Sequence, residues 1–441
     1  MDLIPDLGGW PLTIVATIIA LSVIVAVHEY GHYIVGRWSG IHAEVFSIGF
    51  GPTIFSRTDR RGTKWQLAAF PLGGYVKFLG DSSAASGQDV EAMAKMDDGT
   101  RRRTMHGAPL WARSATVAAG PVFNFVMSIC VFAVFVLLSG QAVDEPRVGP
   151  LRDLPADMVL LQEGDVITAI EGTAVETLAD VLVQGRELDG GPALTYTLER
   201  DGATLDVEAS FPLIPVVDSV AAQSAAIDAG LEVGDVIRAI DGTPVFAFHE
   251  LRDIVEGSNG EPLLLSVWRE GEEIEITLSP RRMDLPTADG GFETRWLIGI
   301  TGGLFFEPVT EPVGLWRAAD YGLDQTWFII RSSLSGAWHM ITGRIDVCNL
   351  QGPIGIAETS GAAASQGIDD FIWFIAVLST AVGLLNLFPI PILDGGHLVF
   401  HAYEAVVGKP PPERVLQVLM SIGLALLLTL MLFATFNDFT C

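Results

Sequence analysis

The sequence predicts a polytopic α-helical membrane protein with four transmembrane helices, a membrane-associated β-hairpin region and two tandem extracytoplasmic α+β domains. Three observations support this fold class. Hydrophobic residues make up 49% of the 441-residue chain, and its mean hydropathy is +0.41, as in integral membrane proteins. Four uncharged segments are each long enough to cross a bilayer. An acidic region between the second and third of these segments contains an internal sequence repeat.

The expected spans are the four long segments without a formal charge, Leu7–Val27, Ser114–Val143, Phe371–Leu393 and Val415–Asn437. Each meets the requirement of about 20 apolar residues for a transmembrane helix. The first Lys or Arg of the chain is Arg37. A cleaved signal peptide begins with a basic region, so the first segment is expected to be a retained anchor.

The distribution of charge predicts the topology. The loop at 37–109 is rich in Lys and Arg, and the turn before the last span carries Lys409 and Arg414. The positive-inside rule places both in the cytoplasm, with the two termini and the acidic region outside. Residues 141–367 hold 37 Asp and Glu, 13 Arg and no Lys, a net charge of −24. Such acidity argues against nucleic acid as a partner.

The first cytoplasmic loop contains three short apolar stretches that read as strands, Val45–Gly51, Lys64–Phe70 and Tyr75–Leu79. Gly-Pro and Pro-Leu-Gly-Gly turns separate them. Their hydrophobicity suits a sheet that dips against the membrane, and the alternative is a small cytoplasmic hairpin without a role. Residues 81–104 are polar and are expected to be flexible.

The acidic region repeats a short sequence pattern, because Gly164–Val175 recurs further along the chain as Gly234–Val245. The shared pattern, GDxIxxI[DE]GxxV, resembles PDZ domains of bacterial proteases, with expected bounds of 144–213 and 214–283. PDZ domains bind an extended peptide along a sheet edge, and the alternative is a pair of spacers that bind nothing. In the connector at 284–367, an aromatic helix at 312–343 either lies along the membrane surface or packs in the core of the repeats.

Three cysteines, Cys130, Cys348 and Cys441, give neither a disulfide framework nor a CxxC zinc pattern. A bridge between Cys348 and Cys441 requires both to face an oxidising compartment. Unpaired thiols are the expectation.

The motif His28-Glu29-Tyr30-Gly31-His32 continues the first apolar segment. HExxH places two imidazoles one helical turn apart on the same face, where they can bind one Zn²⁺ with the glutamate as general base. An ionisable group at membrane depth costs about 3 kcal/mol unless it is paired, ligated or hydrated. The alternative is a His/Glu cluster that lies in the lipid headgroups.

A catalytic zinc usually has three protein ligands, and the candidate for the third is Asp394 at the end of the third uncharged segment. Pro389 and Pro391 just before it preclude a regular helix, and irregular backbone at membrane depth usually borders a cavity or a site. His397 is expected to be a neighbour rather than a ligand. In the second segment, Asn124 of an AGPVFN sequence could be an interhelical hydrogen-bond link.

HExxH in the first span, GPxxN in the second and NxxPxPxLDG in the third resemble the site-2 protease family of intramembrane metalloproteases. The resemblance covers essentially the whole chain, in order. It implies a zinc site of His28, His32 and Asp394, with Glu29 as catalytic base. It also implies that Asn386 holds the unwound substrate backbone near the metal and that the PLGGYVK stretch receives the substrate. The substrate-binding residues are then expected to be Gly73, Gly74, Tyr75, Val76, Lys77 and Asn124.

The resemblance implies an inner-membrane zinc endopeptidase of bacteria, with its PDZ-like domains in the periplasm. The tandem repeats and the PLGGYVK stretch point to the branch of the family that acts on an anti-sigma factor during envelope stress. The substrate is then a single-span membrane protein that an upstream site-1-type protease has already cut outside the membrane, and remnant signal peptides are a second substrate class. A membrane metal transporter or sensor and a non-catalytic PDZ scaffold are the alternative functions.

The expected domain order is a first transmembrane helix with HExxH, a cytoplasmic loop, a second transmembrane helix, two PDZ-like domains, a connector, a third transmembrane segment, and a cytoplasmic turn with a fourth helix. Their expected bounds are 1–36, 37–109, 110–143, 144–213, 214–283, 284–367, 368–397 and 398–441.

Overall fold

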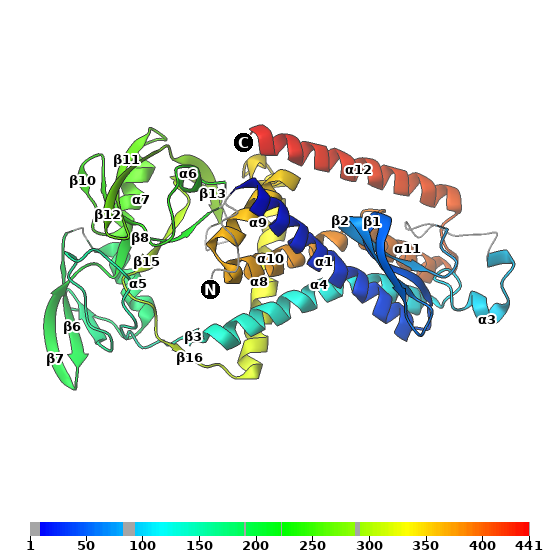
Figure 1. Ribbon diagram of the computed structural model, residues 1–441, viewed down its shortest axis with the longest axis horizontal. Helices are drawn as coiled ribbons and strands as arrows, with labels where there is room; N and C mark the ends of the chain where they lie inside the picture. Colours follow the sequence, from blue (N-terminus) through cyan, green and yellow to red (C-terminus); the bar gives the residue numbers. More distant parts are fainter. Residues whose placement is uncertain (1–8, 83–92, 189–190, 222, 287–291, 441) are drawn as a thin grey trace. The chain divides into compact units, whose positions relative to one another are not determined.

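The computed structural model describes residues 9–82, 93–188, 191–221, 223–286 and 292–440 (Figure 1). Its backbone divides into two compact units. The first unit contains residues 1–135, 315–338 and 350–441, and the second contains 136–314 and 339–349. The predicted start of the first span, at Leu7, lies outside the described residues.

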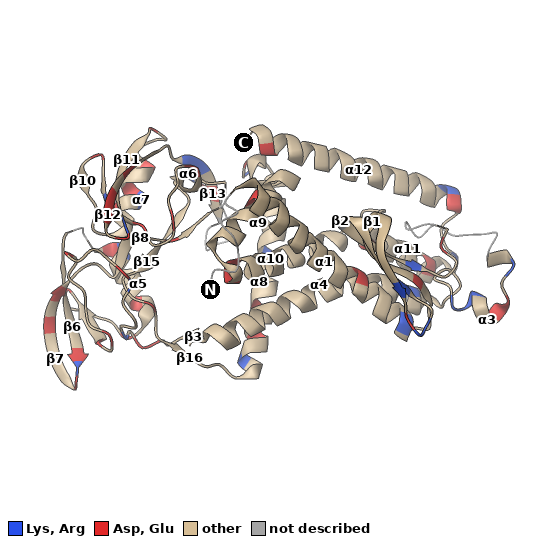
Figure 2. Ribbon diagram, in the orientation of Figure 1, with Lys and Arg blue, Asp and Glu red and all other residues tan. Residues whose placement is uncertain are grey.

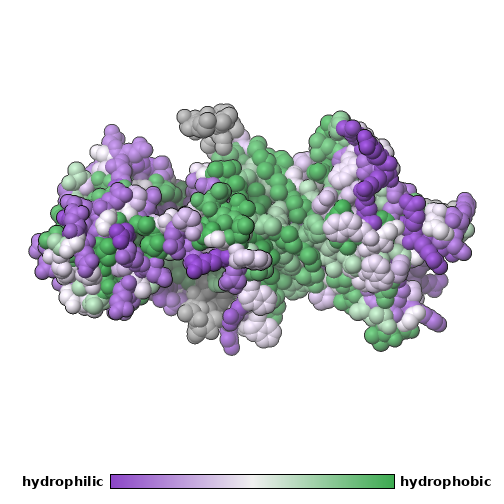
Figure 3. All heavy atoms as spheres, turned by 90° about the horizontal axis from the view of Figure 1, so that it is seen from below, coloured by the Kyte–Doolittle hydropathy of each residue, from purple (hydrophilic) through white to green (hydrophobic). Residues whose placement is uncertain are grey.

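Four helices of the first unit have the length and hydropathy of membrane spans: α1 (Trp10–Trp38), α4 (Leu110–Ser139), α10 (Ile368–Asn386) and α12 (Glu413–Thr440). Many of their apolar side chains remain exposed in the isolated chain, and Figure 3 shows a broad hydrophobic surface. Each of the four uncharged segments therefore contributes one membrane-length helix. Helix α4 ends at Ser139, because Gly140 takes a φ of +76° and β3 (Gln141–Ala142) pairs with β16 (Thr310–Glu311).

The third apolar segment is not one continuous helix. Helix α10 ends at Asn386, residues 387–393 form turns, and α11 (Asp394–Val407) begins at Asp394. Pro389 and Pro391 account for the interruption, since neither can donate a backbone hydrogen bond within a helix. The predicted break is confirmed, and it places Asp394 in the first turn of a new helix.

Two further helices of the first unit pack against these spans. Helix α9 (Pro353–Gln366) lies along α1, where Gly361 allows Thr13 to approach closely. At its start, the Asp438 carboxylate of α12 accepts hydrogen bonds from the backbone N–H groups of Gly352, Ile354 and Gly355 at 2.7–3.2 Å. This carboxylate caps α9 from another helix and anchors the end of α12.

Helix α8 (Leu315–Ile341) corresponds to the aromatic helix expected in the connector. Most of it belongs to the first unit, and it exposes aromatic side chains such as Trp316, which is 90% exposed, and Trp327, which is 65% exposed. The alternative prediction, that this helix packs in the core of the repeats, is therefore wrong. Its placement along the membrane surface stays a prediction.

The loop expected to lie in the cytoplasm folds into β1 (Ala43–Thr58) and β2 (Lys64–Phe78), two long antiparallel strands that bend strongly. Residues 43–48 lie opposite 74–78 and also opposite 64–67, while 53–58 lie opposite 64–68. The stretches 64–70 and 75–79, expected as separate strands, fall in the single strand β2, which ends at Phe78. In the described part of the chain, residues 74–78 pair only with 43–48, so they form one edge of the sheet.

The edge stretch of β2, residues 74–78, runs alongside helix α1. Ser22 donates to the Pro71 carbonyl oxygen at 3.3 Å, a Cβ added to Gly74 would meet Val25 and Glu29, and one added to Gly36 would meet the Phe78 ring. About seven strand residues and fourteen helix residues each span roughly 21–23 Å, so strand and helix run side by side. The apolar end of the sheet therefore lies beside HExxH or nearer to the N-terminal end of α1. Its exposed side chains are Phe50, Ile54, Phe55, Leu67 and Phe70.

Residues 93–104 are not flexible coil, contrary to the expectation for 81–104. They include the short helix α3 (Asp98–Arg101), whose N-cap residue Asp97 accepts from the N–H groups of Gly99 and Thr100. Met93 and Thr104 are buried. Short polar segments can be ordered by caps and a few buried contacts that composition does not reveal. Residues 83–92 lie outside the described chain.

The second unit contains two sheets that correspond to the sequence repeats. The first has strand order β5-β4-β6-β7 and helix α5, with bounds Thr173–Ala174, Val166–Ile170, Leu194–Arg200, Ala203–Ala209 and Leu178–Glu187. The second has strand order β12-β11-β9-β8-β15, with β10 on β9 and with helices α6 and α7. Their bounds are Glu272–Leu278, Leu263–Arg269, Val236–Ile240, Leu213–Val220, Ile300–Leu304, Thr243–Pro244, Ala225–Asp228 and Phe248–Gly257. Strand β15 lies beyond residue 283, in the expected connector, yet pairs with β8.

The repeated Gly-Asp pair has a structural role in both sheets. Asp165 is 1% exposed and binds Arg200 through two hydrogen bonds of 2.6–2.7 Å, and Asp235 binds Arg269 in the same way. Burial alone would raise the pKa of Asp165, but the hydrogen bonds from Arg200 and from the Gln162 backbone, together with the charge of Arg200, outweigh burial and lower that pKa. Acidic residues are spread over this unit (Figure 2), and the two equivalent ion pairs stabilise its repeats.

The remaining elements of the second unit are the hairpin β13 (Arg281–Pro286) and β14 (Phe292–Leu297) and the turn η1 (Val347–Asn349). Cys348 in this turn is disulfide-bonded, so the expectation of unpaired thiols is wrong for it. Sequence spacing gives no information on which distant segments a fold brings together. Cys130 is free, as expected, and Cys441 lies outside the described residues.

Candidate metal centre

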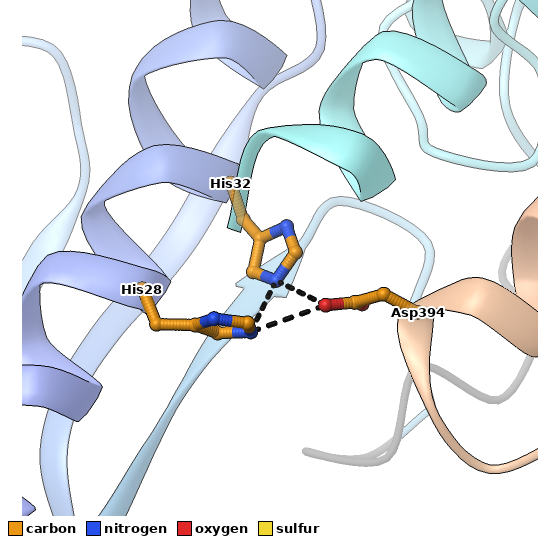
Figure 4. A group of neighbouring side chains, drawn as sticks. All are labelled: His28, His32 and Asp394. Carbon is orange, nitrogen blue, oxygen red and sulfur yellow. Dashed lines mark hydrogen bonds and ion pairs between the residues drawn. The ribbon is translucent and has the colours of Figure 1, made fainter. Parts of the chain in front are cut away.

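His28, His32 and Asp394 converge on one point (Figure 4). The two histidines are one turn apart on α1, and their Nε2 atoms are 3.2 Å from each other. Asp394, from the start of α11, places its Oδ2 atom 3.1 Å from the Nε2 of His28 and 3.5 Å from that of His32. The structure thus brings together the three residues that the sequence singled out as metal ligands.

The spacing of these atoms fits a zinc ion. Zn–N and Zn–O bonds of about 2.1 Å in a tetrahedron require ligand atoms about 3.4 Å apart, close to the three observed separations. Within the described chain, the Asp394 Oδ2 is buried without a hydrogen-bond donor, as expected of an atom reserved for a cation. Two imidazoles and one carboxylate leave the fourth position open, which is typical of catalytic zinc.

Helix α4 supports both histidines from behind. The backbone carbonyl oxygen of Thr116 is 2.8 Å from the Nδ1 of His32, and the Asn124 side-chain amide is 3.3 Å from the Nδ1 of His28. Both contacts leave the Nε2 atoms facing Asp394. Thr116, Gly120 and Asn124 recur at helical spacing and form one stripe of α4.

Gly120 lets α4 approach the centre. A Cβ atom at this position would lie 2.4 Å from the Nε2 of His32 and 2.8 Å from the Cε1 of His28. On the other side, a Cβ at Gly31 would lie 2.5 Å from the Ala119 carbonyl oxygen. The sequence motifs contained both glycines, but only the packing of α1 against α4 reveals that any side chain there would enter the ligand cluster or separate the helices.

Asp394 is positioned by the turn that precedes it. Gly395 and Gly396 are buried, and added Cβ atoms would lie 2.2–2.3 Å from the carbonyl oxygens of Leu387, Phe388 and Ile390. The two glycines therefore allow the irregular segment to fold over the start of α11. The helix N-terminus favours a negative charge at Asp394.

Polar contacts also join α4 to α11. Arg113 donates to both carboxylate oxygens of Glu404, at 2.6 and 3.1 Å, and Ser114 lies 3.2 Å from His401. These contacts link the helix that supports the two histidines to the helix that carries the aspartate. They therefore help to fix the position of the two histidines relative to the aspartate.

The predicted catalytic glutamate borders the β-sheet. Glu29 is half-buried between the two histidines in the sequence of α1, and its Cγ atom would be 3.3 Å from a Cβ on Gly74. Asn386 ends α10 and donates to the Val382 carbonyl oxygen at 3.0 Å, a contact within its own helix. Its role toward substrate therefore stays a prediction.

The other predicted substrate-binding residues lie along the edge stretch of β2, with different surroundings. Gly73 faces the Phe50 ring, Tyr75 accepts a hydrogen bond from Gln66, and Lys77 forms an ion pair with Glu44 at 3.1 Å. Val76 is 5% exposed in an apolar core with Tyr33 and Phe46. Of this stretch, Gly74 is the residue that approaches Glu29.

The sequence is similar to known proteins over nearly its whole length. The family model of peptidase family M50 matches residues 16–430. A protein of Agrobacterium fabrum named "Putative zinc metalloprotease" is 36% identical over 429 residues, covering 96% of this chain and 95% of that protein. Its namesake in Rhizobium meliloti is 36% identical over 430 residues, covering 97% and 96%. The regulator of sigma-E protease RseP of Salmonella typhimurium is 32% identical over 455 residues, covering 96% and 98%.

Proposed function

Because this chain belongs to peptidase family M50, the site-2 protease family of zinc metalloendopeptidases, we propose that it cuts single-span membrane proteins within or near their transmembrane segment. Zinc is its cofactor. Because members of this family are enzymes, we set aside the alternatives of a metal transporter or sensor and of a non-catalytic scaffold. The observation that carries the proposal is the convergence of His28 and His32, on a membrane-length helix, with Asp394. These three residues are the proposed ligands of one zinc ion per chain.

The position of the centre along α1 supports cleavage inside the membrane. Helix α1 runs from Trp10 to Trp38, and His28 lies in its second half. At about 1.5 Å per residue, His28 is about 27 Å from the start of the helix and about 15 Å from its end. A hydrocarbon layer of about 30 Å that ends near Trp38 therefore contains the centre.

Zinc in this ligand set supplies Lewis-acid activation of water and of the scissile carbonyl. Glu29 then accepts the proton of the attacking water and returns it to the leaving amine. His28, His32 and Asp394 hold their ligand atoms toward one point, and α4 excludes bulk water from behind.

A helical substrate must unwind before its peptide bond can be attacked, and unwinding in lipid leaves backbone groups without partners. The edge stretch 74–78 of β2 could supply replacement hydrogen bonds by strand addition, beside Glu29. We assign Asn386 to hold the substrate backbone on the other side. The edge position of this stretch and the approach of Gly74 to Glu29 support this assignment.

We also propose a topology and a substrate. The basic β1–β2 turn and Gly408 face the cytoplasm, and the second unit, with two PDZ-like repeats, lies in the periplasm together with both termini. An anti-sigma factor cut first outside the membrane is the proposed substrate, supported by the similarity to RseP. Reporter fusions test the topology: those at Gly408 should report cytoplasm and those at Asp201 the outside, and the reverse would invert the arrangement.

The decisive test of function is cleavage by the purified protein in lipid nanodiscs. A single-span reporter with a short extracytoplasmic end should yield two fragments whose masses place the cut within or near the span. The matched control is Glu29→Gln, which should keep its zinc. Cuts confined to soluble parts of the reporter would contradict intramembrane proteolysis.

A further inference from the structure

We propose that Asn124 positions the metal ligand His28, instead of binding substrate as the sequence predicts. Its side chain is 0% exposed, and its amide nitrogen lies 3.3 Å from the Nδ1 of His28. In the described part of the chain, its Oδ1 atom is buried without a hydrogen-bond partner. A buried unpaired amide oxygen beside a ligand histidine requires a chemical reason.

The tautomer of a ligand histidine provides that reason. A neutral imidazole that binds zinc through Nε2 carries its proton on Nδ1, so Nδ1 is a donor. The Asn124 Nδ2 atom is also a donor, and two donors cannot share a hydrogen bond. Flipping the amide about its terminal bond exchanges its two atoms and places Oδ1 opposite Nδ1–H. One flip thus satisfies the orphan oxygen and the histidine together.

The other histidine has the same arrangement. The Thr116 carbonyl oxygen is 2.8 Å from the Nδ1 of His32, so α4 supplies an acceptor to each ligand ring. Acceptors of this kind set the tautomer and orientation of a ligand histidine. The backbone of Asn124 is also fixed, since its carbonyl oxygen accepts from Ser128 and Ser379 at 3.0 and 3.1 Å.

Zinc affinity tests this inference, which rests on the proposed zinc site. Asn124→Leu removes the acceptor and should weaken zinc binding about 10- to 100-fold in a chelator competition. Asn124→Asp retains an acceptor and should stay within about threefold of the wild type. The matched control is Thr380→Val, which removes a buried hydroxyl of α10 whose described hydrogen bond is to the Ala376 carbonyl oxygen of its own helix, and it should leave affinity unchanged.

Cobalt substitution gives a second readout that a merely structural role would not change. The visible absorption of the Co²⁺ form should shift in Asn124→Leu and be retained in Asn124→Asp. Wild-type affinity and spectrum in the leucine variant would overturn the positioning role, even with the zinc site intact. Wild-type protein without zinc would instead overturn the proposed function.

A separate observation points to a lipid site at the β1–β2 turn. Arg57, Arg60, Arg61 and Lys64 form no ion pair with any described residue, although nine other arginines of this acidic chain do. The one acid among them, Asp59, accepts hydrogen bonds from the backbone of Arg61 and Thr63 and from the Trp65 indole. The turn therefore keeps unneutralised cations (blue in Figure 2).

We infer that this turn binds the headgroup of an anionic phospholipid of the cytoplasmic leaflet. A pocket of about 260 Å³ is lined by Arg57, Thr58, Asp59, Arg60 and Trp65. Residues 53–58 rise about 17 Å, close to the roughly 15 Å of hydrocarbon in one leaflet. With the apolar end of the sheet in the membrane, the guanidinium groups reach the headgroups, and their forked donors match phosphate oxygens.

Native mass spectrometry of the full chain can test this site with phosphatidylglycerol, phosphatidylcholine and inorganic phosphate as probes. Phosphatidylglycerol should bind at least tenfold more tightly than phosphatidylcholine, and Arg57→Gln/Arg60→Gln should remove that preference. The charge-matched control is Arg102→Gln/Arg103→Gln, which should keep it. A preference that survives in the first variant, or equal binding of inorganic phosphate, would overturn the site.

Discussion

Replacement of Gly120 by alanine should abolish zinc binding while leaving the helix intact. The added Cβ would lie 2.4 Å from the His32 Nε2, 2.5 Å from the His32 Cε1 and 2.8 Å from the His28 Cε1. Ordinary carbon contacts are about 3.5 Å or longer, so the rings must retreat by about 1 Å. Zinc sites tolerate about 0.2 Å in bond length. We therefore expect zinc affinity to fall by at least about 100-fold.

The assay is metal content by mass spectrometry together with chelator competition on purified protein. The helix propensity of alanine is higher than that of glycine by about 1 kcal/mol, so a loss of zinc binding cannot be explained by a weaker helix. Gly336→Ala in α8 is the matched control, because among the described residues no atom beyond the adjacent backbone of its own helix lies within 4 Å of its added Cβ. It should keep wild-type zinc. Wild-type affinity in Gly120→Ala would refute the assignment of the Nε2 atoms to the metal.

Three further predictions concern the surroundings of the centre. Gly74→Ala places a Cβ 2.7 Å from the Ser47 carbonyl oxygen and 3.3 Å from the Glu29 Cγ, so the edge stretch must shift beside Glu29. This should lower kcat at least tenfold with zinc content unchanged, and a matching loss of zinc would mean general misfolding. If the acidic repeats exclude substrates with bulky ectodomains, deletion of Val148–Pro280 should permit cleavage of a substrate that has not been trimmed outside the membrane. A gel assay in which the deletion variant still cuts only trimmed substrate would show that another part of the protein excludes these ectodomains. Because the pKa of Asp165 is lowered in the fold, its ion pair contributes stability above about pH 4 that is lost as pH falls through the folded pKa. Arg200→Gln should therefore lower the stability of the first repeat at pH 7 and lower it less at pH 2–3, as measured by hydrogen exchange of that repeat; a loss of stability that does not depend on pH would refute the ionic account.

The metal ligands could be predicted from sequence because their chemistry is unusual in its context. His28 and His32 have helical spacing inside an apolar segment, and Asp394 ends a segment broken by prolines. Costly groups at membrane depth need a reason, and a shared metal provides one. The four spans followed from hydropathy in the same way.

The support of the ligands could not be predicted, since it depends on which helix faces pack together. Gly120 and Asn124 belong to a motif, but the motif does not show that this stripe of α4 faces the imidazoles. Thr116 acts through its backbone carbonyl, which no side-chain pattern can reveal. Strand β15 depends on β8, a partner distant in sequence, and such long-range contacts leave no local signal.

The most direct test of the central claim is zinc K-edge X-ray absorption on purified protein, in wild type and in Glu29→Gln. We predict about one zinc per chain in both, with two imidazole nitrogens and oxygen ligands at about 2.0–2.2 Å. Glu29→Gln should give the same spectrum but no cleavage of the single-span reporter. A first shell with one imidazole or none, or cleavage by Glu29→Gln, would contradict the account.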